Sequence, residues 1–196
     1  MAQVREAQRI TSGVEIVDEV SHTNDPQSNG AVEQAVWTVK SKTTSVVATL
    51  ERMIGRTIPL HHPIVGWAAQ FTADCLNRYV IGSDGLTVVQ RLRGGNPRQP
   101  VACFGETVIF PMLKRERESW GPEVEHMGRW AKGVWVGRSW NSNKSIVLHE
   151  RGISRPRTIK RLVDAKKWRP DLVEKLTVAP WGKEVAPEET EGEQEQ

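Results

Sequence analysis

The sequence predicts an α+β fold, with long helices in the first half of the chain and a small β-module in the second half. Apolar residues recur every three or four positions over residues 31–53 and 63–79, which is the period of an amphipathic helix. Beyond residue 98, short runs of β-branched and aromatic residues alternate with turn formers, which is typical of strands. We therefore expect a boundary at the Gly- and Pro-rich segment at residues 94–100.

Composition indicates a protein with an ordinary core and no membrane partner. The 196 residues are 38% hydrophobic and 26% charged, which allows a packed core beneath a strongly polar surface. No apolar run approaches the roughly 18 residues of a membrane span, and the N-terminus lacks the apolar centre of a signal peptide. Because Cys75 and Cys103 cannot build a disulfide framework, a reducing compartment is favoured.

The net charge of +3 combines a basic body with an acidic tail. From Lys183 onward the chain holds one lysine and six glutamates, and the remainder has 26 basic and 18 acidic residues, a net charge of +8. Such a tail is predicted to be disordered and solvating. The body favours a polyanionic partner, with nucleic acid as the first candidate, although a merely soluble basic protein fits the charge equally well.

The first thirty residues are predicted to form a helix, a strand and a loop. The helix would end at Gly13, and alternation of apolar and acidic residues predicts a strand at residues 14–20. Turn formers then lead to Asn29, which is well placed to cap the next helix.

Start and stop signals bound three further helices. Gly55 terminates the first, Pro63 begins the second, and a short third helix lies between the cap residue Thr87 and the stop residue Gly94. The stripe predicted to face the core in the first helix comprises Val32, Val36, Val39, Thr43, Val46, Leu50 and Met53. In the second helix it comprises Ile64, Ala68, Phe71, Cys75 and Tyr79, so Cys75 is predicted to be a core residue.

The second half of the chain predicts a small β-barrel. Residues 101–113 resemble a strand, and residues 133–149 predict a hairpin around the turn Asn-Ser-Asn-Lys. The last ordered segment is expected at residues 161–176. The predicted organisation is a helical part at residues 1–97, a β-module at 98–165 and a helical or disordered acidic tail at 166–196.

Three segments resemble the integrase region of copia-type LTR retrotransposon polyproteins. Residues 28–40, Ser-Asn-Gly-Ala-Val-Glu-Gln-Ala-Val-Trp-Thr-Val-Lys, are similar to the last conserved motif of retroviral and retrotransposon integrase cores. Residues 67–97 resemble the helices that follow the core, and residues 104–148 resemble the SH3-like module that comes next. The resemblance covers about residues 14–165. It implies the C-terminal part of an RNase H-like core, with long helices and an edge strand, in a protein that integrates DNA.

By this resemblance Glu33 is the third carboxylate of a D,D,E triad that holds two Mg²⁺ ions. In the family these ions activate a water or a DNA 3′-hydroxyl and stabilise the leaving oxygen of a phosphodiester. From the residues alone, Glu33 is an ordinary glutamate in the first turn of a helix, where the helix dipole favours its charge. The family's two aspartates have no counterpart here, because Asp18 and Asp25 lie too close to Glu33. We therefore expect no DNA joining by this chain alone.

The resemblance also implies a DNA-facing surface at the start of the first long helix. Its candidate residues are Asn29, Trp37, Lys40 and Lys42. Lys40 lies two helical turns beyond Glu33 and therefore on the same face, where it would bind phosphate without reading sequence. Each of these residues also has a simpler role. Asn29 could cap the helix, and Lys40 could be a solvated lysine. For Trp37 we favour packing against the core.

A second candidate surface lies in the β-module. Residues 151–161 are the densest basic run of the chain and include Arg155, Arg157 and Lys160. They suit an extended segment that follows phosphates, and a solvated basic loop is the alternative. Three tryptophans, Trp130, Trp135 and Trp140, alternate with basic residues nearby. Packing is favoured for Trp135, and the roles of the other two stay open.

Other signals are weaker. The adjacent histidines His61 and His62 do not predict a zinc site, because no further ligand stands at a suitable spacing. DNA is thus the expected partner, a second copy of the chain is a further candidate, and the resemblance implies a nuclear location. The competing interpretation is a non-catalytic module that binds nucleic acid or a protein.

Overall fold

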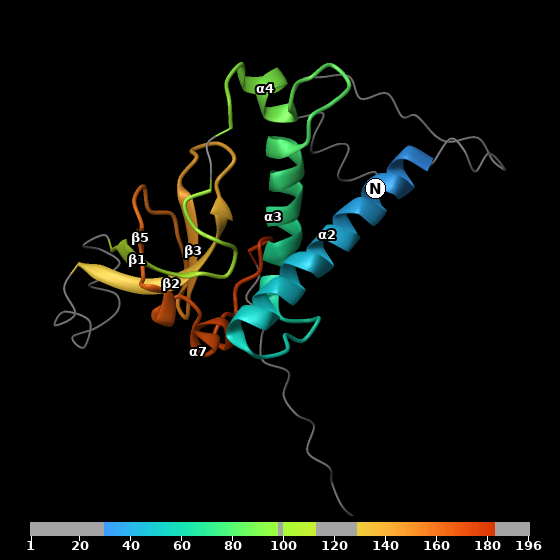
Figure 1. Ribbon diagram of the computed structural model, residues 1–196. Helices are drawn as coiled ribbons and strands as arrows, with labels where there is room; N and C mark the ends of the chain where they lie inside the picture. The colour runs from blue at the N-terminus through green and yellow to red at the C-terminus, as the bar shows by residue number, and fades with distance from the viewer. Residues whose placement is uncertain (1–29, 98–99, 113–128, 183–196) are drawn as a thin grey trace, which may run out of the picture. The chain divides into compact units, whose positions relative to one another are not determined.

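The computed structural model describes residues 30–97, 100–112 and 129–182 (Figure 1). The chain divides into two units between Thr38 and Val39, and only residues 30–38 of the first unit are described. The helix, strand and loop predicted before Gly30 lie outside the described residues, as does the acidic segment from Lys183. No helix in the described ranges is both long enough and apolar enough to cross a membrane.

The three predicted helices are confirmed, and with the antiparallel sheet they confirm the α+β class. They are α2 (Gly30–Ile54), α3 (Pro63–Tyr79) and α4 (Val88–Arg93). At the start of α3, Nδ1 of His62 accepts a hydrogen bond from the Ile64 backbone N–H at 3.2 Å. Thr87 and Gln90 form a reciprocal capping box on α4, and Gly94 ends that helix in the left-handed region, at φ 67°.

Five antiparallel strands form one sheet in the order β4-β3-β2-β1-β5. The strands are β1 (Thr107–Pro111), β2 (Trp130–Arg138), β3 (Ser145–His149), β4 (Gly152–Ser154) and β5 (Lys160–Arg161). The predicted hairpin is confirmed as β2 and β3, whereas the first strand is shorter than residues 101–113. Because β5 returns beside β1, the segment at residues 155–159 connects opposite edges of the sheet.

A bulge at Val136 sets the direction in which β2 ends. Trp135 pairs with Val147 and Gly137 pairs with Ile146, so Val136 is the extra residue. A bulge bends its strand and redirects the side chains beyond it. The bulge interrupts the alternation of side chains between the two sides of the sheet. Arg138, the last residue of β2, lies beyond this interruption.

Two apolar clusters form the core. One unites Leu50 of α2, Trp67 of α3 and Val134 of β2 with residues near the C-terminus of the described chain, including Val173. The other includes Phe110 and the buried side chain of Trp135, which confirms the packing role predicted for this tryptophan. Packing is thus continuous across the predicted division at residues 97 and 98.

The C-terminal residues also join this packing. A 3₁₀ turn (Asp164–Lys166) precedes α7 (Pro170–Glu174), and the Val178 carbonyl accepts a hydrogen bond from Nε1 of Trp67 at 2.8 Å. Figure 1 shows α3 standing beside the sheet, with α7 near one end of β2. Helix α7 agrees with the ordered segment predicted at residues 161–176, and the packing extends beyond it to Val178.

The predicted stripe of α2 is only partly correct. Leu50 is buried, but Val32 and Val36 are exposed, and Ile54 is buried in place of Met53. The predicted positions repeat every 3.5 residues, whereas an α-helix has 3.6 residues per turn. The predicted stripe therefore rotates around the helix by about 20° per heptad. After three heptads, Ile54 faces the core in place of Met53. In α3 the expected apolar stripe reaches the core at Ile64, Ala68 and Phe71, whereas Cys75 is only partly buried and Tyr79 is 38% exposed.

Cys75 lies at the edge of the core and not within it, because it belongs to neither apolar cluster. Its side chain is partly buried, and this burial, assisted by the nearby charge of Asp74, raises the pKa of the thiol to about 11. The thiol is therefore protonated at neutral pH.

Candidate nucleic-acid interface

One face of the sheet combines two lysines with a tryptophan. Lys132 on β2 and Lys160 on β5 both pair with Ile109 of β1, and Trp130 pairs with Pro111. Directly paired residues, and residues two positions apart in a strand, project from the same side of a sheet. We call Trp130, Lys132 and Lys160 the basic–aromatic face.

The geometry of this face leaves its cations accessible. Nζ of Lys160 lies 4.2 Å from the centre of the Trp130 ring, and 36% of Trp130 is exposed. Neither Lys132 nor Lys160 forms an ion pair within the part of the chain that the structure describes. A cation held over an indole, beside a second unpaired cation, can contact a phosphate while the exposed part of the ring stacks on a base or sugar.

The next residue in the chain, Arg161, has a structural role. Its guanidinium donates to both carboxylate oxygens of Glu106, from Nε at 2.7 Å and from Nη2 at 2.9 Å. These hydrogen bonds raise the pKa of Arg161 above its usual value. Because successive residues of a strand point to opposite sides, Arg161 is directed to Glu106 while Lys160 lies on the basic–aromatic face.

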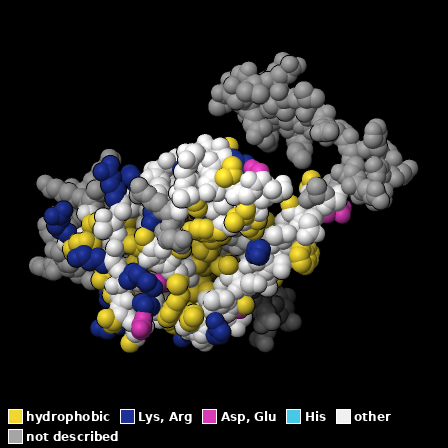
Figure 2. Space-filling view, turned by 45° about the horizontal axis from the view of Figure 1, so that its top comes forward, with side chains coloured by type: hydrophobic (Ala, Val, Ile, Leu, Met, Phe, Trp, Pro, Cys, Tyr) yellow, Lys and Arg dark blue, Asp and Glu magenta, His cyan; other side chains and the backbone are white. Residues whose placement is uncertain are grey.

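Arg155 and Arg157 are held outward between β4 and β5. Both are exposed, and Pro156 between them is buried, with its carbonyl accepting a hydrogen bond from the Ser145 N–H at 3.1 Å. This anchor fixes the segment so that the two flanking side chains point away from the core. Figure 2 shows Lys and Arg side chains gathered over the part of the surface that the sheet contributes.

A further group of cations surrounds Trp140, in the turn after β2. The guanidinium carbons of Arg93 and Arg78 lie 4.7 and 5.7 Å from the centre of the Trp140 ring, and Nη2 of Arg93 donates to the Trp140 carbonyl. Neither arginine was among the candidate residues predicted from the sequence. They belong to α4 and α3, and no local pattern indicates that these helices place them against the turn.

The residues predicted on α2 do not form a comparable group. Glu33 and Trp37 are exposed in the first unit, and Lys40 and Lys42 are exposed in the second. Trp37 is 64% exposed, so the favoured packing role is wrong for the described structure. Asn29 and the elements predicted before Gly30 lie outside the described residues.

The described residues do not fit a two-cation centre. Glu33 lies in the first turn of α2, as expected, but within the described ranges no group of three or more His, Cys, Asp and Glu residues could hold a metal ion. His62 is used as a helix cap, and its pKa is lowered mainly by burial. A carboxylate can bridge two Mg²⁺ ions, but holding both ions in place needs further carboxylates, and the described residues place none beside Glu33.

Comparison with protein-family models, curated proteins and solved structures finds no match for this chain.

Proposed function

We propose that this chain binds DNA through the basic–aromatic face of its β-module. The observation that carries the proposal is the alignment of Lys132 and Lys160 on one side of the sheet, with Lys160 over the exposed ring of Trp130. The lysines supply sequence-independent contacts to phosphate. Arg155 and Arg157 add to the same positive region of the chain.

We further propose that the chain derives from the integrase of a copia-type LTR retrotransposon. Support comes from the sequence resemblance, from helices α2 to α4 in the expected order, and from the strand order β4-β3-β2-β1-β5. A five-stranded sheet whose last strand returns beside its first is the arrangement expected of an SH3-like module. The partial RNase H-like core rests on the resemblance and on Glu33 at the start of a long helix. The intact parent would join DNA by two-metal strand transfer.

DNA binding is expected to weaken steeply with salt and to depend on the basic–aromatic face. Replacing Lys132 and Lys160 with alanine removes about two phosphate contacts. The slope of log affinity against log salt concentration should then fall by about 2. Fluorescence anisotropy with a labelled duplex, at several salt concentrations, measures this change.

The matched control replaces Arg52 of α2 and Lys175 beside α7, two exposed cations outside both candidate interfaces, with alanine. The net charge is the same in both double variants. Equal losses in the two would assign binding to overall charge, and an affinity that does not change with salt would contradict the proposal.

We expect no DNA joining or nicking by this chain with Mg²⁺ or Mn²⁺. A single carboxylate cannot hold both cations of a two-metal displacement. An oligonucleotide joining assay should give the same background for the native chain and for Glu33→Gln. Activity that the substitution abolishes would show that a catalytic site exists despite the missing aspartates.

Protein binding is the alternative, and an apolar groove favours it. Two pockets of about 430 and 410 Å³ lie along α2 and share Ser45, Val46 and Phe71. Apolar side chains are visible beside α2 in the middle of the surface in Figure 2. A chain that binds no DNA at low salt would favour this function over the first.

A further inference from the structure

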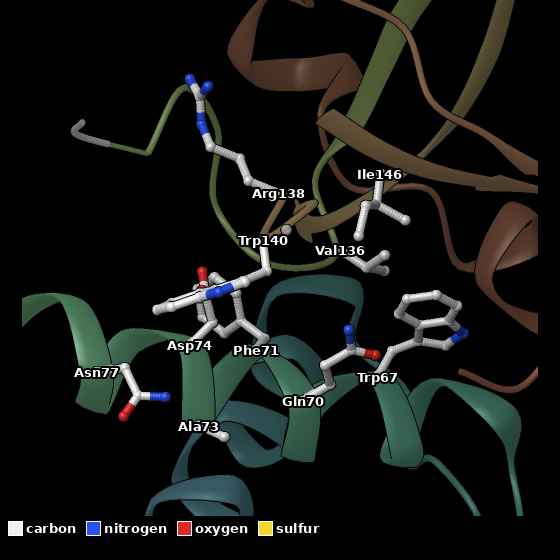
Figure 3. A pocket seen from close by; sticks show the side chains of 11 residues that line it. Trp67, Gln70, Phe71, Ala73, Asp74, Asn77, Val136, Arg138, Trp140 and Ile146 are labelled. Carbon is white, nitrogen blue, oxygen red and sulfur yellow. The ribbon is translucent and has the colours of Figure 1, made fainter. Parts of the chain in front are cut away.

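A separate pocket of about 190 Å³ lies between α3 and the end of β2. Three aromatic residues contribute to its walls: Trp67, Phe71 and Trp140. Figure 3 shows Trp140 lying across α3 above Phe71, with Trp67 at the other end beside Val136 and Ile146. The Trp67 ring is held by its hydrogen bond to the Val178 carbonyl, and Trp140 is held by Arg93. The walls are therefore largely pre-formed, as in ligand sites generally.

Two side-chain amides line the same pocket. The side-chain amides of Gln70 and Asn77 make no hydrogen bond to another residue of the described chain. Each amide offers an N–H donor and a carbonyl acceptor. The unpaired amides can form hydrogen bonds with the edge of a heteroaromatic ring. The flat apolar walls can stack against the faces of the same ring.

The rim of the pocket is cationic. Arg138 lines it and donates from Nη1 to the Asn143 carbonyl at 3.0 Å, while Arg93 lies over the Trp140 ring. The one carboxylate in the lining, Asp74, is neutralised by Arg78 at 2.6 Å. Nη2 of Arg78 is buried and makes no hydrogen bond among the described residues. This charge balance favours a ligand that carries an anion next to its ring.

We infer that this pocket receives an unpaired nucleobase of single-stranded DNA. The base would stack on the aromatic walls and bond through its edge to Gln70 and Asn77, while its phosphates meet Arg93 and Arg138. A base inside a duplex cannot enter, because it is stacked on both faces and its pairing edge is occupied. The inference rests on the proposed DNA binding and makes it selective for unpaired strands.

The pocket and the basic–aromatic face are far enough apart to be tested separately. They lie at opposite ends of β2, which has nine residues, so about 25 Å separates Trp130 from Arg138 along the strand. The lysines of the face would hold the backbone of any DNA. The pocket would add affinity only when a free base is present.

The test compares three fluorescent probes of equal length: a single strand, the same strand made entirely of abasic sites, and the duplex. The variant Ala73→Leu fills the pocket from α3, where leucine keeps the helix propensity. Stacking of one base predicts about tenfold weaker binding of the single strand. Binding of the abasic strand and of the duplex should change less than twofold.

The matched control is Ala48→Leu, which adds the same group at an exposed position of α2 outside the pocket. It should leave all three affinities unchanged. Trp140→Ala should reproduce the selective loss seen with Ala73→Leu. Circular dichroism and thermal melting exclude loss of folding as the cause in each variant.

Different failures lead to different conclusions. A native chain that binds the single strand and the abasic strand equally overturns the base pocket but leaves DNA binding in place, and so does an equal loss on all probes in Ala73→Leu. A native chain that binds none of the probes overturns both proposals. Deoxyadenosine monophosphate tests the free nucleotide as the source of the base. If it competes fully at the concentration of the strand, the pocket belongs to nucleotides and the inference is wrong.

Discussion

Replacing Arg161 with alanine is expected to lower the free energy of unfolding by about 2 to 3 kcal/mol, because it leaves a buried carboxylate without its cation. The Glu106 side chain is fully buried, and both of its oxygens accept hydrogen bonds from Arg161. The backbone N–H of Cys103 donates to the same carboxylate at 3.0 Å. The expected loss is smaller than the roughly 3 to 5 kcal/mol typical of a broken buried pair, because the Arg161 side chain is itself 48% exposed and partly screened by water.

Urea unfolding followed by circular dichroism measures this loss, and two variants serve as controls. Lys160→Ala removes the neighbouring charge, which has no anionic partner in the described structure, and should change stability by less than about 0.5 kcal/mol. Arg161→Lys keeps the charge but not the paired geometry and should give an intermediate loss. If Arg161→Ala and Lys160→Ala destabilise equally, the Glu106 pair does not hold β5 to β1.

Replacing Gly133 with alanine is expected to destabilise the chain by at least about 2 kcal/mol, because the added methyl group has no room. A Cβ atom at this position would lie 2.5 Å from Cγ1 of Val147 and 2.6 Å from the Leu148 carbonyl oxygen. The ring of Phe110, at 3.1 Å, closes the third side. The carbonyl belongs to the neighbouring strand β3 and cannot retreat without disturbing the pairing of β2 with β3.

Gly95→Ala is the matched control for this substitution. A Cβ atom at Gly95 meets nothing within 4 Å, so its replacement should change stability by less than about 0.5 kcal/mol. Thermal unfolding measures the stability of the two variants. The difference between them isolates the effect of the missing space at Gly133 from the general effect of replacing a glycine. Equal stability of Gly133→Ala and the native chain would show that β2 and β3 are not packed as described.

Both substitutions also bear on the proposed interface, because β2 carries Lys132 and β5 carries Lys160. The buried pair below β5 and the close approach at Gly133 hold these strands in the register that aligns the two lysines. Any fall in DNA affinity in these variants should therefore track the loss of folded protein. This differs from Lys132→Ala with Lys160→Ala, where affinity falls without unfolding.

Local patterns were sufficient to predict the helices and the hairpin. The capping residue Thr87, the stop at Gly94 and Pro63 at a helix start act through backbone groups within a few residues, so their effect can be read without knowing the rest of the fold. The same holds for the turn between β2 and β3. Lys160 was also predicted as a candidate contact, because a dense basic run needs no tertiary information to be recognised.

The sequence by itself determined the helices α2 to α4, the hairpin of β2 and β3, and which segments are basic. Only the tertiary structure decided which cations are available: it paired Arg161 with buried Glu106, left Lys160 over Trp130, and gathered Arg78 and Arg93 around Trp140. It also left Trp37 exposed where packing was expected. The physical reason is that a side chain's partners come from strands and helices distant in the sequence, whereas propensity, capping and periodicity act over only a few residues.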